Sequence, residues 1–161
     1  MHGPTTIQPT SLADYLEQMT KAVFQAGISW RVVEAKWDGI RSAFHGFDAI
    51  AVASMKADEV GRVENDARVI RNRHKIEGTV DNAATMLALE KEFGSFKKYL
   101  DSLGDYEAKV ADLHRRFRFM GPSSAFFFLY VVGEQVPDWH EWAETQHRGS
   151  EPRTGSPSRD S

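Results

Sequence analysis

The sequence predicts an all-α protein that folds as one helical bundle. Hydrophobic residues recur three and four positions apart from Leu12 to Val132, which is the spacing of one face of a helix. Residues that cap helices stand where several of these patterns begin, and glycines stand where several of them end. No stretch of any length alternates apolar and polar residues as a half-buried strand does. We therefore expect about eight or nine helices between residues 10 and 144.

Most predicted helices of the first half begin at a side chain that can cap them. These helices are 12–26 after Thr10 or Ser11, 30–44 after Ser29, a short helix from Asp48 to Met55, another that starts at Asp58, and 72–93. Gly27 ends the first of them and Gly94 ends the last. The apolar stripe of each helix is expected to face the core.

The second half of the chain predicts three further helices. Ser95 caps the helix over 96–103, which Gly104 ends, and residues 106–117 form the next one. Pro122 then takes the first helical position before the segment AFFFLYVV. This segment, in the helix predicted over 123–132, is apolar on every side, so we expect its neighbours to bury it at the centre of the bundle.

The composition is that of an ordinary globular domain. The chain has 161 residues, of which 41% are hydrophobic and 27% charged, and its net charge is −3. The absence of cysteine excludes disulfides, a cysteine-ligated zinc and a thiolate nucleophile. The longest apolar run, 125–133, is far shorter than a membrane span, and no leader is visible. We expect a cytoplasmic monomer that binds no membrane, metal or cofactor.

The two ends of the chain differ from the middle in composition. Residues 1–9 carry prolines and no helical pattern, and we expect a flexible lead-in there. Residues 145–161 are rich in Ser, Pro, Gly and Arg, so we expect a disordered tail. Residues 10–144 then form a single helical domain.

Two clusters of basic residues stand out within that domain. One lies in RVIRNRHK (68–75), and the other consists of Arg115, Arg116 and Arg118. Such runs commonly cover a solvated helix face. The second cluster has a further reading, because a glycine before a helix leaves backbone amides free to bind an anion, and Gly121 stands directly after it. Basic side chains beside such amides suit a phosphate backbone.

Two other segments have both a structural and a functional interpretation. In QAGISW (25–30), Gly27 and Ser29 can simply end and begin helices, and Trp30 can be a core residue. Trp30 also lies at the mouth of its helix, where an aromatic face can line a pocket. Asp138 follows the buried helix at a turn, where it can cap the short segment 139–142 or act as a carboxylate in a site.

Four fragments, in this order and spacing, resemble the 3-methyladenine DNA glycosylase I family of the helix–hairpin–helix DNA glycosylase superfamily. They are QAGISW, FHGFDAIAVASM, NDARVIRNRHKIEGTVDNA and FRFMGPSSAFFFLYVVG, within a region from about Tyr15 to Asp138. The resemblance implies an all-α bundle of the helix–hairpin–helix type. It also implies that double-stranded DNA with alkylated bases is the partner, and that a damaged nucleotide is flipped out of the duplex.

The resemblance assigns roles to individual residues. Gly121 would let a DNA phosphate approach the hairpin, and the amides of Ser123 and Ser124 would donate to it, with Arg115, Arg116 and Arg118 alongside. Gly27 and Ile28 would form the wedge in the base stack. Trp30, Gln25 and Ser29 would form the base pocket. Members that also nick DNA carry lysine where Ser123 stands, so a monofunctional glycosylase is expected.

The chain departs from the family pattern in two ways. The family zinc is held by cysteines and histidines, and this chain has no cysteine. The family also places a base-recognising glutamate eight residues before the pocket tryptophan, and here that residue is Ala22. The resemblance to the wider superfamily makes Asp138 the candidate catalytic carboxylate, which would stabilise the sugar cation or orient water.

Three functions fit these observations. The first is hydrolysis of the N-glycosidic bond of an alkylated purine, 3-methyladenine foremost, in base excision repair. The second is a non-catalytic descendant that binds DNA or lesions, which the loss of the glutamate at residue 22 favours. The third is a helical protein–protein module that has inherited only the architecture. Asp138 and the intact QAGISW favour the first.

Overall fold

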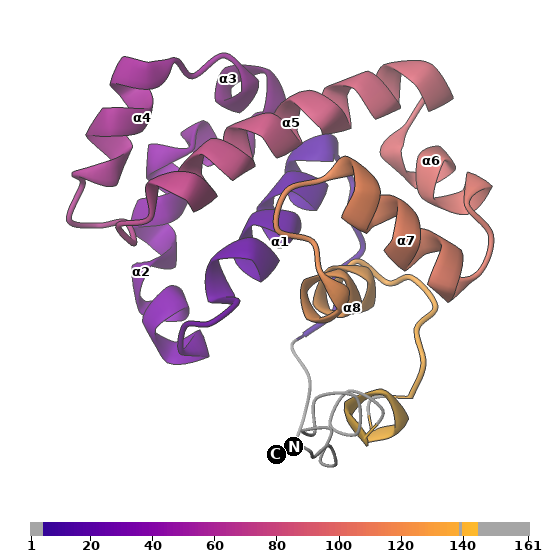
Figure 1. Cartoon of the computed structure of the whole chain (residues 1–161). Coiled ribbons are helices and arrows are strands. Elements are labelled where there is room, and N and C mark those ends of the chain that lie inside the picture. The colour runs from indigo at the N-terminus through magenta and orange to yellow at the C-terminus, as the bar shows by residue number, and fades with distance from the viewer. Residues whose placement is uncertain (1–4, 139, 145–161) are drawn as a thin grey trace, which may run out of the picture.

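The computed structural model describes residues 5–138 and 140–144, and this part of the chain is built from helices without strands (Figure 1). The elements in chain order are α1 (Leu12–Gln25), α2 (Trp30–Ala43), the 3₁₀ turn η1 (His45–Phe47), α3 (Ala49–Ala53), α4 (Ala57–Glu64), α5 (Arg73–Phe93), α6 (Phe96–Ser102), α7 (Tyr106–Arg116) and α8 (Pro122–Val131). Residues 140–144 add one further helical turn. The all-α prediction is confirmed.

The caps explain why most helices begin where the sequence predicts. Ser11, Ser29, Asp48 and Ser95 each accept a hydrogen bond from a backbone amide in the first turn of the helix that follows. The prediction for Asp58 is wrong. Helix α4 begins at Ala57 after Lys56, which makes no side-chain cap, and Asp58 lies inside its first turn. There the carboxylate still faces the positive end of the helix dipole.

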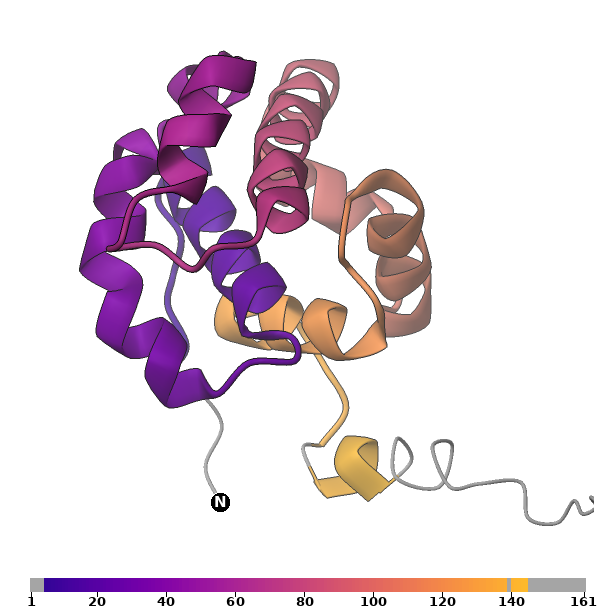
Figure 2. The same ribbon diagram turned by 60° about the vertical axis from the view of Figure 1, so that its left-hand side comes forward.

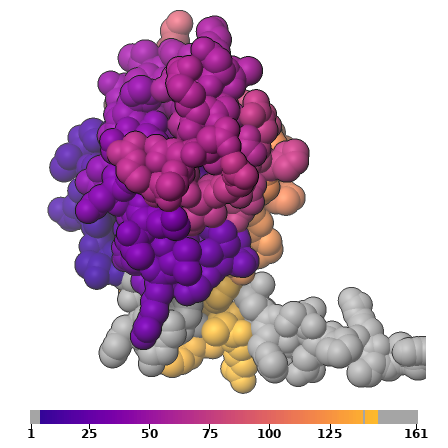
Figure 3. Space-filling view, turned by 90° about the vertical axis from the view of Figure 1, so that its left-hand side faces the viewer, coloured from indigo at the N-terminus to yellow at the C-terminus, as the bar shows by residue number. Residues whose placement is uncertain are grey.

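Helix α1 lies at the centre of the bundle and packs against α2, α5 and α8 (Figure 1). Its inward residues Leu16, Met19 and Val23 are completely buried. Helix α8 is buried as its composition predicts, because Phe126 and Leu129 are fully enclosed. One side of the molecule is covered by α2, α4 and the segment that joins α4 to α5 (Figure 3). None of the helices in the described part is long and apolar enough to cross a membrane.

The first described residues are attached to the bundle. The amide of Ile7 donates to the carbonyl of Val131 at 2.7 Å, so this part of the predicted lead-in runs along the end of α8. The predicted tail, 145–161, lies outside the described residues. The end of α1, the loop after it and the start of α8 come together on one side of the molecule (Figure 2).

Candidate active site and nucleic-acid interface

A pocket of about 390 Å³ opens where α1, α2, α8 and the first described residues meet. Its lining residues are Gln18, Lys21, Ala22 and Gln25 from α1, Trp30 and Glu34 from α2, Phe127 and Val131 from α8, and Thr5 and Ile7. Gln18, Lys21 or Ala22, and Gln25 follow one another at steps of three or four on α1, as Trp30 and Glu34 do on α2, so each helix presents one face to the pocket. This volume is within the range of small-molecule sites.

Trp30 forms one wall of this pocket. It remains 41% exposed, whereas Trp37, two turns further along α2, is buried and donates its indole N–H to Glu17 at 2.8 Å. Trp37 is therefore the core tryptophan of this helix. Trp30 presents an aromatic surface to the pocket, as expected for a residue on which a flipped base stacks.

The other two predicted pocket residues differ in position. Gln25 lines the pocket, and its Oε1 is buried without a hydrogen-bond partner in the described structure. An unpaired buried acceptor costs free energy unless a ligand supplies a donor. Ser29 instead caps α2, where its Oγ accepts from the Arg31 amide, and it is not among the lining residues. Ser29 thus acts on the pocket only by capping the helix that Trp30 begins.

Two charged residues that the sequence interpretation missed also line the pocket. The Lys21 ammonium lies 5.6 Å from the centroid of the Trp30 ring and 5.3 Å from that of Trp37. The same ammonium lies 3.9 Å from the Glu34 carboxylate. Glu34 could have been found from its position four residues after Trp30, which places both on one face of α2.

Ala22 stands where the family has its base-recognising glutamate, so no carboxylate is present at that position. Ala22 lines the pocket as a small apolar residue. Glu17, the nearest acid on the same helix, is committed elsewhere, because it accepts from the Trp37 indole and pairs with Arg41. Among the described residues, Glu34 is the only carboxylate that lines this pocket.

The predicted wedge residues, Gly27 and Ile28, lie in the loop that joins α1 to α2. Lys75 fixes this loop from α5: its ammonium donates to the carbonyl of Ala26 at 2.7 Å and to that of Phe24 at 3.4 Å. Burial lowers the pKa of Lys75. The basic run 68–75 therefore does not lie wholly on a solvated face, because its last residue holds the end of α1. A positive charge there also complements the helix dipole.

Helix α5 holds the hairpin between α7 and α8 as well. Asn82 is buried, and its side-chain amide donates to the Arg118 carbonyl at 3.1 Å while its oxygen accepts from the Arg118 amide at 2.8 Å. One turn earlier, the Phe119 ring lies so close to Gly78 that a Cβ there would meet it at 2.7 Å. Lys75, Gly78 and Asn82 share one face of α5 and together set the wedge loop against the hairpin.

The start of α8 has the features expected of a phosphate site. Gly121 is its N-cap and offers no side chain to accept the amides of the first turn. Nothing within 4 Å would obstruct a Cβ at Gly121, and its φ of −75° suits any residue, so the fold does not itself require glycine there. Ser123 is exposed, while Ser124 is buried and its hydroxyl donates to the Ala22 carbonyl at 3.4 Å. This bond joins the hairpin helix to the pocket wall.

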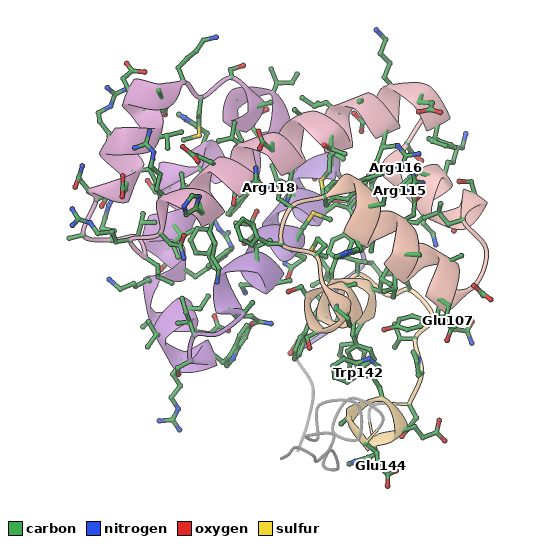
Figure 4. The ribbon with its side chains drawn as sticks, viewed as in Figure 1. Glu107, Arg115, Arg116, Arg118, Trp142 and Glu144 are labelled. Carbon is green, nitrogen blue, oxygen red and sulfur yellow. The ribbon has the colours of Figure 1, made fainter. Side chains whose placement is uncertain are left out.

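The three arginines before the hairpin do not form one cluster. Arg115 and Arg116 lie together on α7, apart from Arg118 (Figure 4). Both pair with Asp112, which also accepts from the Tyr99 hydroxyl at 2.6 Å. Arg118 pairs instead with Asp81 of α5 at 2.7 Å. Arg118 thus lies at the hairpin, whereas Arg115 and Arg116 belong to a network with α6.

The structure gives Asp138 a capping role. Its Oδ2 accepts from the amides of His140 and Glu141, at 3.0 and 3.3 Å, at the start of the last helical turn. Asp138 is not among the residues that line the pocket. Its role as the catalytic carboxylate stays a prediction.

The zinc of the family does not fit this chain. The sequence contains no cysteine. Within residues 5–138 and 140–144, no three His, Asp or Glu side chains come together as a metal site requires.

Comparisons with known proteins identify the family and agree with the fold. A family model described as methyladenine glycosylase matches residues 9–124. The chain is 36% identical over 130 residues to the DNA-3-methyladenine glycosylase of Haemophilus influenzae, covering 68% of this chain and 70% of that protein. It is 28% identical, with the same coverage, to DNA-3-methyladenine glycosylase 1 of Escherichia coli. The structure of 3-methyladenine DNA glycosylase I from Staphylococcus aureus superposes with a TM-score of 0.72 at 25% identity, covering 80% of each chain. The chain belongs to the methyladenine glycosylase family.

Proposed function

We propose that this protein is a DNA repair glycosylase that hydrolyses the N-glycosidic bond of 3-methyladenine in double-stranded DNA. The observation that carries the proposal is the pocket between α1, α2 and α8, with Trp30 half exposed on its wall and the start of the hairpin helix bonded to Ala22. The curated relatives bear the same activity in their names.

Once the base is flipped out of the duplex, cleavage of its bond to the sugar needs little catalysis from protein side chains. Methylation at N3 places a positive charge on the purine nucleotide, so the base leaves readily when the bond to the sugar breaks. The bonding electrons stay with the base, and water adds to the sugar cation that remains. Stacking on Trp30 holds the base, and the unpaired Oε1 of Gln25 can accept from the exocyclic amine of adenine.

Binding to DNA rests on the hairpin and the wedge. The free amides at the start of α8 can donate to a phosphate, and Arg118 adds a positive charge beside them. Gly27 and Ile28 would enter the base stack from the loop that Lys75 anchors. Because Ser123 stands where lysine serves the nicking enzymes, we propose hydrolysis without strand cleavage.

Asp138 is proposed as the carboxylate that stabilises the sugar cation or orients water. Its capping role can be separated from this chemistry because asparagine caps a helix as well as aspartate does. Asp138→Asn therefore keeps the last helical turn and removes only the charge. A general base of this kind contributes about 10²–10⁴-fold to the rate.

The test is single-turnover release of methylpurine from methylated duplex DNA by the wild type, Trp30→Ala and Asp138→Asn. We expect free 3-methyladenine and abasic sites without nicks from the wild type, and much slower release from Trp30→Ala. Release that survives in Asp138→Asn would keep the activity and remove Asp138 from the mechanism. A wild type that binds abasic DNA but releases no base would be a lesion-binding protein.

A further inference from the structure

The pocket is lined by one positive and one negative side chain whose charged ends meet. Lys21 comes from α1, next to Ala22, and Glu34 comes from α2, one turn after Trp30. Their charged atoms lie 3.9 Å apart, which is an ion pair but too long for a hydrogen bond. The structure shows no other partner for Glu34 among the described residues, so its oxygens keep most of their hydrogen-bonding capacity.

We propose that Glu34 binds the positive charge of the flipped base, in place of the carboxylate absent at residue 22, and that Lys21 is the counterion it exchanges for that base. This inference rests on the proposed function and assigns the residue that recognises the substrate. It relocates the recognition carboxylate from α1 to α2.

The position of Lys21 supports an exchange. Its ammonium lies over the Trp30 ring and beside Glu34, which are the two features that a cationic purine stacked on Trp30 would use. Such a base therefore competes with Lys21 for the same ring and the same carboxylate. The attraction between Glu34 and a positive base offsets the loss of the Lys21 contacts, whereas an unmodified purine gains no charge–charge attraction from the carboxylate.

The exchange reverses when the bond breaks. The glycosidic electron pair moves to the purine, the positive charge passes to the sugar, and the released base becomes neutral. Glu34 then loses its attraction for the base, and the ammonium of Lys21 can return to the ring and the carboxylate. The same pair thus favours the charged substrate over the neutral product.

The experiment measures binding of two small ligands to the full-length chain by isothermal titration calorimetry. The cationic ligand is 3,9-dimethyladeninium, whose second methyl group stands for the sugar, and the neutral ligand is 9-methyladenine. The variants are Glu34→Gln and Lys21→Met, with Asp38→Asn as the matched control. Asp38 is an exposed carboxylate one turn further along α2 that does not line the pocket.

Glu34→Gln is expected to weaken binding of the cation about five-fold and to leave the neutral ligand within about two-fold. Lys21→Met is expected to strengthen binding of the cation by a similar factor, and Asp38→Asn to change neither ligand. Equal effects of Glu34→Gln on both ligands, or no effect on the cation, would overturn the inference. If Glu34→Gln contradicts the inference but the wild type still releases methylpurine, the proposed glycosylase function stands and only the role of Glu34 is wrong. If the wild type releases no base, the proposed function itself is wrong.

Discussion

Replacement of Asn82 by alanine tests whether α5 fixes the hairpin between α7 and α8, which we propose binds DNA. Asn82 is 2% exposed, and both ends of its side-chain amide bond the backbone of Arg118. Each such bond contributes about 0.5–1.5 kcal/mol, so Asn82→Ala should lower the free energy of unfolding by about 1–3 kcal/mol. The matched control is Asp81→Asn on the same turn of α5, which removes the exposed ion pair to Arg118 and should cost less than about 1 kcal/mol.

The assay is urea denaturation followed by tryptophan fluorescence, with binding of an abasic duplex measured by fluorescence anisotropy. Without the two hydrogen bonds from Asn82, the hairpin must be ordered when DNA binds, and this costs binding free energy. Asn82→Ala should therefore also weaken the DNA complex under conditions where the protein remains folded. If Asn82→Ala has an unfolding free energy no lower than that of Asp81→Asn and binds DNA as tightly as the wild type, Asn82 does not fix the hairpin.

Two further variants test the other contacts that position the site. Lys75→Met removes the hydrogen bonds to the carbonyls of Phe24 and Ala26 that anchor the proposed wedge loop, so single-turnover base release should slow and abasic DNA should bind more weakly. Burial raises the pKa of Asp112, but hydrogen bonds from Tyr99 and Arg116 outweigh it, so the pKa in the folded protein is below the ordinary value of 3.8. The ionised carboxylate therefore stabilises the fold above pH 3.8, and this stabilisation is lost as the pH falls through the lower pKa of the folded protein. Denaturation at several pH values from 6 down to 2 should therefore show a smaller acid loss of stability for Asp112→Asn than for the wild type, with the difference developing below about pH 4.

The helices and their order could be predicted because the signals for them are local. A periodic stripe and a capping side chain lie within a few residues of each other, as Asp48 shows by accepting from the amides of Ile50 and Ala51. The error at Asp58 has the same local origin. An aspartate near a helix start is favourable both as a cap and inside the first turn, so its presence does not say which residue begins the helix.

The site was predictable only where a motif marks it. Trp30 and Gln25 were found through QAGISW, and the start of α8 through its glycine and proline. The sequence shows Lys75 only as part of a basic run. It does not show that the ammonium reaches the carbonyls of Phe24 and Ala26, about fifty residues earlier. Asn82 gave no signal either, since an asparagine inside a helix has no pattern that predicts a long-range partner.

The sequence by itself determined the fold class, the family, and the absence of the zinc ligands and of the recognition glutamate. Each of these depends on residue identity and on spacing along the chain. Only the tertiary structure decided that the charges of Lys21 and Glu34 meet in the pocket beside Trp30, that Lys75 reaches the carbonyls at the end of α1, and that Asn82 holds the backbone of Arg118. The physical reason is that periodicity tells which face of a helix turns inward, whereas packing between distant segments decides which part of that face is left uncovered and which charges meet there.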